Sequence, residues 1–158
     1  MKIILLVLAT FFFQTAWSQE IKVIKYPDLA KIIEEDNNQV RVINFWATWC
    51  GPCVKELPQF EALRQKYQSQ DVQVILVSFD FVEQLAKARQ FAQKKNLQST
   101  LYLLDETDYN SFIDKIDPQW SGAIPATLML DNRTNKRAFY EKEFKEHELE
   151  KTFAQFIN

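Results

Sequence analysis

An apolar stretch at residues 40–46 is separated by three residues from the first of the only two cysteines of the chain, Cys50 and Cys53. The stretch is rich in β-branched and aromatic residues, which predicts a strand buried on both faces. Because no other cysteine can cross-link the fold, the core has to hold by packing alone. The sequence therefore predicts a buried central strand that leads to a pair of thiols.

The spacing of the two cysteines favours chemistry over structural cross-linking. A disulfide across two intervening residues closes a very small loop, so it removes little entropy from the unfolded chain. Residues three apart in a helix lie about 5–6 Å apart at Cα, which suits an S–S bond. The pair can thus open and close without unfolding its surroundings. We interpret Cys50 and Cys53 as a redox-active disulfide that needs no other cofactor and no metal.

The hydrophobic pattern predicts strands that alternate with helices and a final hairpin and helix. The predicted strands are 20–26, 40–46, 72–79, 100–104, 126–130 and 137–140, and the predicted helices are 27–36, 54–67, 81–95, 108–116 and 146–157. This order indicates an α/β fold with a central mixed sheet and helices on both faces. The acids Asp105, Glu106 and Asp108 are expected to cap the helix that follows them.

The first residues have the pattern of a signal peptide. Lys2 precedes an apolar run at residues 3–13. Ala16 and Ser18 then place small residues at the −3 and −1 positions of a cleavage site after Ser18. The run is well short of the roughly 20 residues that span a bilayer, so no stable membrane span is expected in the mature chain. We expect residues 1–18 to be a leader, residues 19–158 to be one domain, and the protein to be exported.

The bulk composition excludes two classes of function. The formal charge of −2 provides no basic stripe, so no nucleic-acid partner is expected. The chain has two glycines and no glycine-rich phosphate loop. His147, the single histidine, lies in a charged run near the C-terminus and is expected on the surface, away from the cysteines.

The position of the cysteines at a strand-to-helix junction assigns a role to each. The amides and the positive dipole at the helix start favour the thiolate of Cys50, which makes it the nucleophile. Cys53, one turn inside, is the resolving thiol. Pro52 has no amide hydrogen to lose in the first helical turn, and Gly51 lets a partner backbone approach. Trp49 is expected to offer the partner an apolar surface next to Cys50.

Trp46 carries two interpretations. It could flank the thiols together with Trp49, or it could be an ordinary core residue.

Residues 45–53, Phe-Trp-Ala-Thr-Trp-Cys-Gly-Pro-Cys, resemble the active-site signature of the thioredoxin superfamily. Glu56 and Pro58 extend the likeness to its secreted TlpA/ResA-like branch. The resemblance covers the whole mature chain and implies a thioredoxin-like sheet with an inserted helix between the central strands. It also implies that Ile124 and Pro125 form a cis-proline loop that faces the cysteines and pairs with the substrate backbone.

The same resemblance gives Glu56 a role. Cytosolic thioredoxins carry an acid where this chain has Asn44, and an amide cannot accept a proton from Cys53 at neutral pH. In TlpA/ResA-like proteins, the glutamate three residues after the second cysteine is an acid–base candidate, which here is Glu56. The alternative is that Glu56 only satisfies the first turn of its helix, where acids are favoured.

These observations favour an exported thiol–disulfide oxidoreductase that reduces disulfides in protein substrates and receives electrons from a membrane-bound donor. Family resemblance suggests service to cytochrome maturation or to disulfide repair. A disulfide oxidant or isomerase is the nearest alternative. Two further alternatives are a module that binds Cu(I) through its two thiolates and a binding module without turnover.

Overall fold

The computed structural model describes residues 20–158, so the predicted leader lies outside the described residues. The strands are β1 (Lys22–Ile24), β2 (Val40–Trp46), β3 (Val72–Ser78), β4 (Thr100–Leu104), β5 (Ala126–Asp131) and β6 (Lys136–Tyr140). The α-helices are α1 (Tyr26–Glu34), α2 (Gly51–Tyr67), α3 (Leu85–Lys94), α4 (Ile113–Ile116) and α5 (Glu148–Ile157). Two 3₁₀ turns, η1 (Val82–Gln84) and η2 (Tyr109–Ser111), precede α3 and α4.

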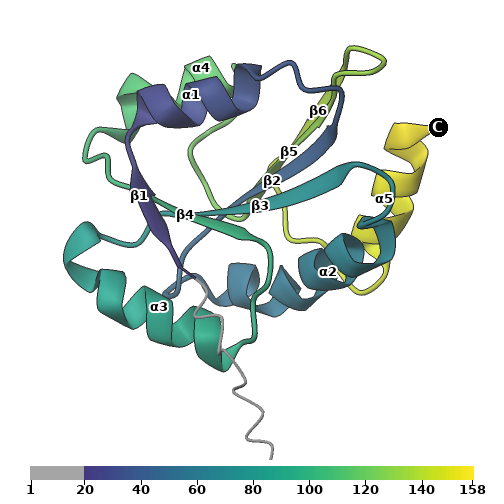
Figure 1. Cartoon of the computed structure of the whole chain (residues 1–158). Coiled ribbons are helices and arrows are strands. Elements are labelled where there is room, and N and C mark those ends of the chain that lie inside the picture. The colour runs from purple at the N-terminus through teal and green to yellow at the C-terminus, as the bar shows by residue number, and fades with distance from the viewer. Residues whose placement is uncertain (1–19) are drawn as a thin grey trace, which may run out of the picture.

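The six strands form one mixed sheet in the order β1-β4-β3-β2-β5-β6. The first four strands in that order are parallel, and β5 and β6 are antiparallel to their neighbours. Figure 1 shows α1 and α4 over one face and α2, α3 and α5 over the other. The predicted thioredoxin-like sheet with helices on both faces is confirmed, and α3 is the additional helix between the parallel strands β3 and β4.

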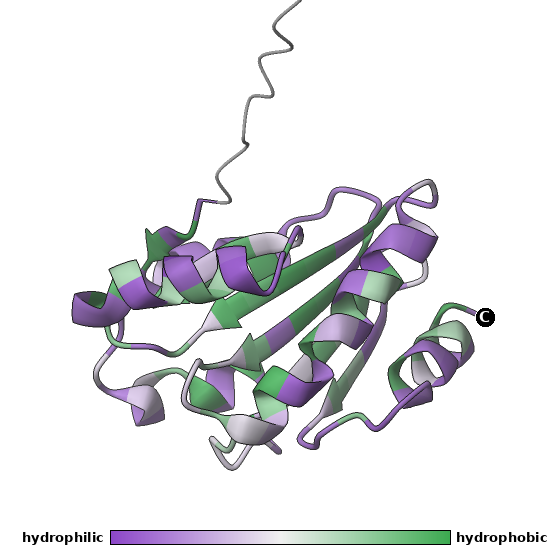
Figure 2. Ribbon diagram, turned by 90° about the horizontal axis from the view of Figure 1, so that it is seen from below, coloured by the Kyte–Doolittle hydropathy of each residue, from purple (hydrophilic) through white to green (hydrophobic). Residues whose placement is uncertain are grey.

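The central strand β2 carries the core. All seven of its residues are buried, and it pairs with β3 on one side and β5 on the other. Phe45 packs on one face against Trp120, with ring centroids 4.7 Å apart, and Trp46 packs on the other against Phe91 at 5.5 Å. In Figure 2 the strands are mainly hydrophobic, whereas the helices also carry hydrophilic residues. Full burial on both faces explains the continuous apolar run of this strand.

The buried face of α2 packs against β3 and α5. Its buried residues have the helical spacing that the sequence predicts. The buried residues of this face recur every three or four positions, as expected for one side of a helix, and are Leu57, Phe60, Leu63 and Tyr67. Tyr67 meets Phe153 of α5 edge to face at 4.8 Å.

No helix within residues 20–158 is long and apolar enough to cross a membrane.

Three predicted helices are shorter or divided. Segment 81–95 begins as η1 and becomes α-helical at Leu85, and segment 108–116 divides into η2 and α4. The last helix starts at Glu148 rather than at residue 146, because His147 takes a left-handed conformation with φ of 62°. Such a residue interrupts right-handed helical geometry.

The prediction that Asp105 and Glu106 cap the helix that follows them is wrong. Glu106 accepts a hydrogen bond from the amide of Tyr26 at 2.8 Å, and Asp105 pairs with Lys25 at 2.9 Å. Asp108 makes no side-chain cap for η2. Parallel pairing of β1 with β4 brings these acids to the start of α1, where helix amides lack partners. The two acids therefore stabilise α1 instead of the helix next to them in sequence.

Candidate active site

The two cysteines lie where β2 passes into α2, and they form a disulfide. Cys50 is the N-cap of α2, and its sulfur accepts a hydrogen bond from the amide of Cys53 at 3.3 Å. Cys50 keeps 6% of its surface exposed, whereas Cys53 has none. Of the two cysteines, Cys50 is therefore the one that a partner can reach, and its sulfur also lies at the amides and the dipole of the helix start.

The loop before β5 faces this disulfide. The Ile124–Pro125 peptide bond is cis, and the carbonyl oxygen of Ile124 lies 3.8 Å from the Cys50 sulfur. A sulfur in a disulfide carries no proton, so this contact can become a hydrogen bond only after reduction. The indole of Trp120 donates to the carbonyl of Ala123 at 2.8 Å, which anchors the loop to the core. The loop predicted to face the cysteines does so.

Gly122 gives this loop its shape. Its φ of +92° is disfavoured for other residues, and a Cβ at this position would lie 2.8 Å from the Ile113 side chain. The neighbouring Ser121 and Ala123 amides donate to the carboxylate of Glu141, at 3.0 and 3.3 Å. Gly122 and the carboxylate of Glu141, the residue after β6, thus position the carbonyl that faces Cys50.

The two tryptophans of the motif have different environments. Trp46 is completely buried in the core, so its interpretation as a core residue is the correct one. Trp49 is 61% exposed beside Cys50, and Gly51 and Pro52 are exposed as well. Of the two tryptophans, only Trp49 therefore lies at the open side of the disulfide.

Glu56 lies one turn after Cys53 on α2 and has no exposed surface. Its Oε1 accepts a hydrogen bond from the Asn44 amide at 2.9 Å, and its Oε2 accepts one from the Phe144 main-chain amide at 2.8 Å. Burial raises the pKa of Glu56 from 4.5 to about 7, and these two hydrogen bonds oppose the rise. The nearby charge of Glu143 adds to it. A carboxyl group with this pKa can gain and lose a proton near neutral pH.

Asn44, which stands where cytosolic thioredoxins carry an acid, connects Glu56 to the start of β5. Its side-chain amide nitrogen also lies within hydrogen-bond range of Thr127 Oγ1, at 3.1 Å, and of the Ala126 carbonyl, at 3.3 Å. Asn44 therefore links the central strand, Glu56 and the first residues of β5. It orients the carboxyl group without adding a second buried charge.

The structure also identifies a buried carboxylate that the sequence analysis missed. Asp80, 2% exposed, accepts hydrogen bonds from the Thr48 amide at 3.0 Å, the Thr48 hydroxyl at 2.6 Å and the Ser78 hydroxyl at 2.7 Å. Thr48 is two residues before Cys50, so Asp80 ties the cysteine turn to the end of β3. The parallel pairing of β2 with β3 was the available signal, because it places the ends of both strands together.

Two exposed apolar side chains were missed for a related reason. The large hydrophobic residues exposed among residues 20–158 are Trp49, Phe81 and Val82, with 61, 59 and 37% of their surface accessible. Phe81 directly follows Asp80, whose carboxylate binds Thr48 next to Trp49. Trp49 lies in the loop after β2, Phe81 lies in the loop after β3, and Val82 begins η1. We call these three residues the apolar rim.

A cavity of about 560 Å³ lies between α2 and the segment that joins β6 to α5. Its wall includes Gln59 and Phe144, whose main-chain amide donates to Glu56. His147 borders it with 85% of its side chain exposed, which confirms the expected surface position. Among residues 20–158, no group of three or more His, Cys, Asp or Glu side chains is arranged to hold a metal ion.

The fold and the disulfide at the start of α2 define a protein of the thioredoxin-like class. Residues 11–138 match the AhpC/TSA family, and the chain belongs to that family. The likeness of the motif to TlpA/ResA-like proteins is confirmed by the relatives.

The chain is similar to a thioredoxin-like protein, YneN, of Bacillus subtilis, with 32% identity over 58% of this chain and 50% of that protein. It is also similar to the thiol-disulfide oxidoreductase ResA of Bacillus cereus, with 42% identity over 56% of this chain and 47% of that protein. The chain spans about half the length of these curated relatives. A secreted thiol-disulfide isomerase of Corynebacterium glutamicum has the same fold, with a TM-score of 0.61, 20% identity and coverage of 75% of this chain and 68% of that one.

Proposed function

We propose that this protein is an exported thiol–disulfide oxidoreductase that reduces disulfides of protein substrates. One observation carries the proposal: the Cys50–Cys53 disulfide lies at a helix start, where Cys50 keeps 6% of its surface exposed and Cys53 keeps none. Similarity to thiol-disulfide oxidoreductases such as ResA supports it.

In the reduced protein, the Cys50 thiolate attacks one sulfur of the substrate disulfide. The substrate S–S bond breaks, its other sulfur leaves as a thiolate that takes up a proton, and Cys50 is joined to the substrate. Cys53 then loses its proton and attacks the Cys50 sulfur, which releases the second substrate thiolate and forms the Cys50–Cys53 disulfide. Two electrons have moved to the substrate, and an electron donor must return them.

Glu56 is proposed as the group that takes the proton from Cys53. The two residues are one helical turn apart, and neither has exposed surface. Water therefore does not reach Cys53 directly, and a carboxyl group with a pKa of about 7 is suited to exchange a proton there. The alternative role at the helix start is less well supported, because the carboxylate binds Asn44 and Phe144 rather than the first amides of α2.

The substrate is proposed to bind across Trp49, Gly51 and Pro52 on one side of the disulfide and the Ile124–Pro125 loop on the other. The carbonyl of Ile124, 3.8 Å from the Cys50 sulfur, offers an acceptor to an extended substrate backbone. The apolar rim widens this surface toward Phe81, which suits substrates that present apolar side chains near their cysteines.

The cellular setting remains part of the proposal. The apolar leader at residues 3–13 and the secreted relative from Corynebacterium support export with cleavage near Ser18. A membrane-bound electron donor then supplies the electrons. The proposed cellular process in which the protein acts is cytochrome maturation or disulfide repair. Because that relative is named an isomerase, an oxidant or isomerase is kept as the second candidate.

The test is dithiol-dependent reduction of insulin by the purified protein. We expect catalysis by the wild type, none by Cys50→Ser, and a stable mixed disulfide with the substrate in Cys53→Ser, because the resolving thiol is then missing. Stoichiometric Cu(I) binding without any thiol exchange would instead support the copper module and contradict the proposal.

A further inference from the structure

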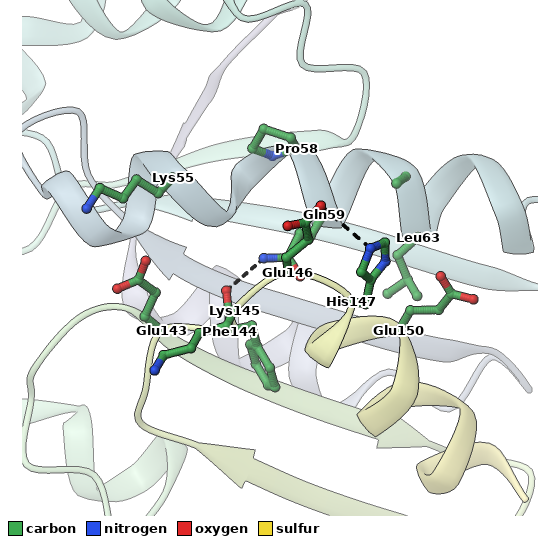
Figure 3. A pocket seen from close by; sticks show the side chains of 11 residues that line it. Lys55, Pro58, Gln59, Leu63, Glu143, Phe144, Lys145, Glu146, His147 and Glu150 are labelled. Atoms are coloured by element: carbon green, nitrogen blue, oxygen red, sulfur yellow. Dashed lines mark hydrogen bonds and ion pairs between the residues drawn. The ribbon is translucent and has the colours of Figure 1, made fainter.

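The main chain of Phe144 is bound to α2 on both sides. Its amide donates to Glu56 Oε2 at 2.8 Å, and its carbonyl accepts a hydrogen bond from Gln59 Nε2 at 2.7 Å. Figure 3 shows Gln59 reaching from α2 to this carbonyl. Glu56 and Gln59 are three residues apart, so they lie on the same side of the helix. One residue of the segment between β6 and α5 is therefore held at two points on one helix face.

Gln59 is placed in a way that stability alone does not explain. Its Oε1 is buried without a hydrogen-bond partner within the part of the chain that the structure describes. A buried carbonyl oxygen without a partner is unfavourable, and an apolar side chain of similar length would avoid it. What the glutamine provides is the bond from Nε2 to the Phe144 carbonyl.

The surroundings make that bond important for the position of Phe144. The cavity of about 560 Å³ borders Phe144 and Gln59, so the segment is not packed tightly against α2 on this side. The Phe144 ring is buried and meets Tyr140 of β6 edge to face at 5.6 Å. Two hydrogen bonds link the Phe144 main chain to the helix beside this cavity.

We propose that Gln59 is a positioning residue for Glu56: it holds the Phe144 main chain so that the Phe144 amide reaches the buried carboxylate. This inference rests on the proposed acid–base role of Glu56. The hydrogen bond of Gln59 goes to the Phe144 carbonyl, so in this proposal Gln59 acts through the Phe144 main chain.

The groups around Glu56 give the direction of the effect. Asn44 from β2 and the Phe144 amide donate to the carboxylate and lower its pKa, while Glu143 of the same segment raises it. Cys53, one turn earlier on α2, is held in the disulfide and does not titrate in the oxidised protein, and Thr127 on β5 is neutral. When Gln59 no longer holds Phe144, the carboxylate loses a donor and keeps the charge of Glu143 nearby. The pKa of Glu56 should then rise.

The experiment compares Gln59→Met with the matched control Gln65→Met in the full protein. Gln65 is an exposed glutamine on the same helix and lines a different surface, near Lys95. Methionine keeps the length of the side chain and removes the donor. The pKa of Glu56 is measured from its carboxyl carbon by NMR in the oxidised protein, and exchange of the Phe144 amide is measured alongside.

We expect Gln59→Met to raise the pKa of Glu56 by about one unit, the size of one lost hydrogen bond to a charged group, and to speed exchange of the Phe144 amide. Gln65→Met should change neither. An unchanged Glu56 pKa in Gln59→Met, or an equal shift in both variants, would overturn the proposal. If Gln59→Met does not fold, Gln59→Leu replaces it with the same expected shift.

This result is separate from the proposed function. The pKa and the amide exchange are read without any substrate, so a protein inactive toward insulin would still answer the question about Gln59. Conversely, if the protein is active and the pKa of Glu56 is unchanged in Gln59→Met, the oxidoreductase proposal stands and only the positioning role of Gln59 is refuted.

Discussion

Replacement of Glu56 by glutamine should change how the stability of the oxidised protein depends on pH. The folded protein holds the Glu56 proton up to a pKa of about 7, whereas the unfolded chain releases it near 4.5. Between these values the folded state binds more protons than the unfolded state, so stability falls as the pH rises. The contribution of Glu56 is therefore complete below about pH 4.5 and is lost as the pH passes through about 7.

The size of this effect follows from the two pKa values. A difference of roughly 2.5 units at about 1.4 kcal/mol each gives about 3 kcal/mol lost by the wild type across this window. Glu56 is fully buried, so solvent does not screen the effect. Glutamine does not titrate, and the Glu56→Gln variant lacks this loss. Relative to the wild type, the variant should gain about 3 kcal/mol of unfolding free energy between about pH 4 and about pH 8.

Urea denaturation of the oxidised proteins at several pH values from about 4 to about 8 measures this difference. Glu146→Gln is the matched control, because Glu146 has 89% of its side chain exposed and its loss removes one surface carboxylate. The difference between wild type and Glu56→Gln should grow steadily with pH, and that between wild type and Glu146→Gln should stay nearly flat. Parallel curves for wild type and Glu56→Gln would refute the reasoning, since Glu56 would then titrate as it does in the unfolded chain.

Two other substitutions test the surroundings of the disulfide. Phe81→Ser should leave stability nearly unchanged, because the side chain is exposed, but raise KM about tenfold for a protein disulfide and not for oxidised glutathione. An equal change for both substrates would contradict a docking role for Phe81. Asp80→Ala should lower the unfolding free energy by about 3 kcal/mol, because it leaves the Thr48 amide and the Ser78 hydroxyl without their acceptor. A loss below about 1 kcal/mol in urea denaturation would show that these bonds contribute little.

The parts of the fold that could be predicted from the sequence are those set by local patterns. Strands 40–46 and 100–104 were predicted with the bounds that the structure has, because each is a short β-branched or apolar run with clear ends. The cysteine turn was equally clear, since both thiols and the first helical turn lie within a few residues. Glu56 was predicted from the resemblance to TlpA/ResA-like proteins, in which the glutamate three residues after the second cysteine is an acid–base candidate.

The parts that were missed depend on contacts between distant segments. Glu106 serves a helix that begins 80 residues earlier, and only the pairing of β1 with β4 brings it there. Phe144, 88 residues after Glu56, donates a hydrogen bond to the buried carboxylate through its main-chain amide. A pattern of side chains in the sequence cannot predict a bond made by the main chain. Phe81 is predicted as the first residue of a helix, and that pattern does not indicate that 59% of its surface is exposed. Sequence patterns locate the sulfurs, and tertiary structure supplies the groups that control them.

The reduction potential of the Cys50–Cys53 pair tests the central proposal most directly. It is measured by equilibrating the purified protein with dithiothreitol or glutathione buffers and quantifying the free thiols. A protein that reduces disulfides should have a potential near that of thioredoxins, about −270 mV. A potential near −120 mV would mark the pair as a strong oxidant and contradict the proposed direction of electron flow.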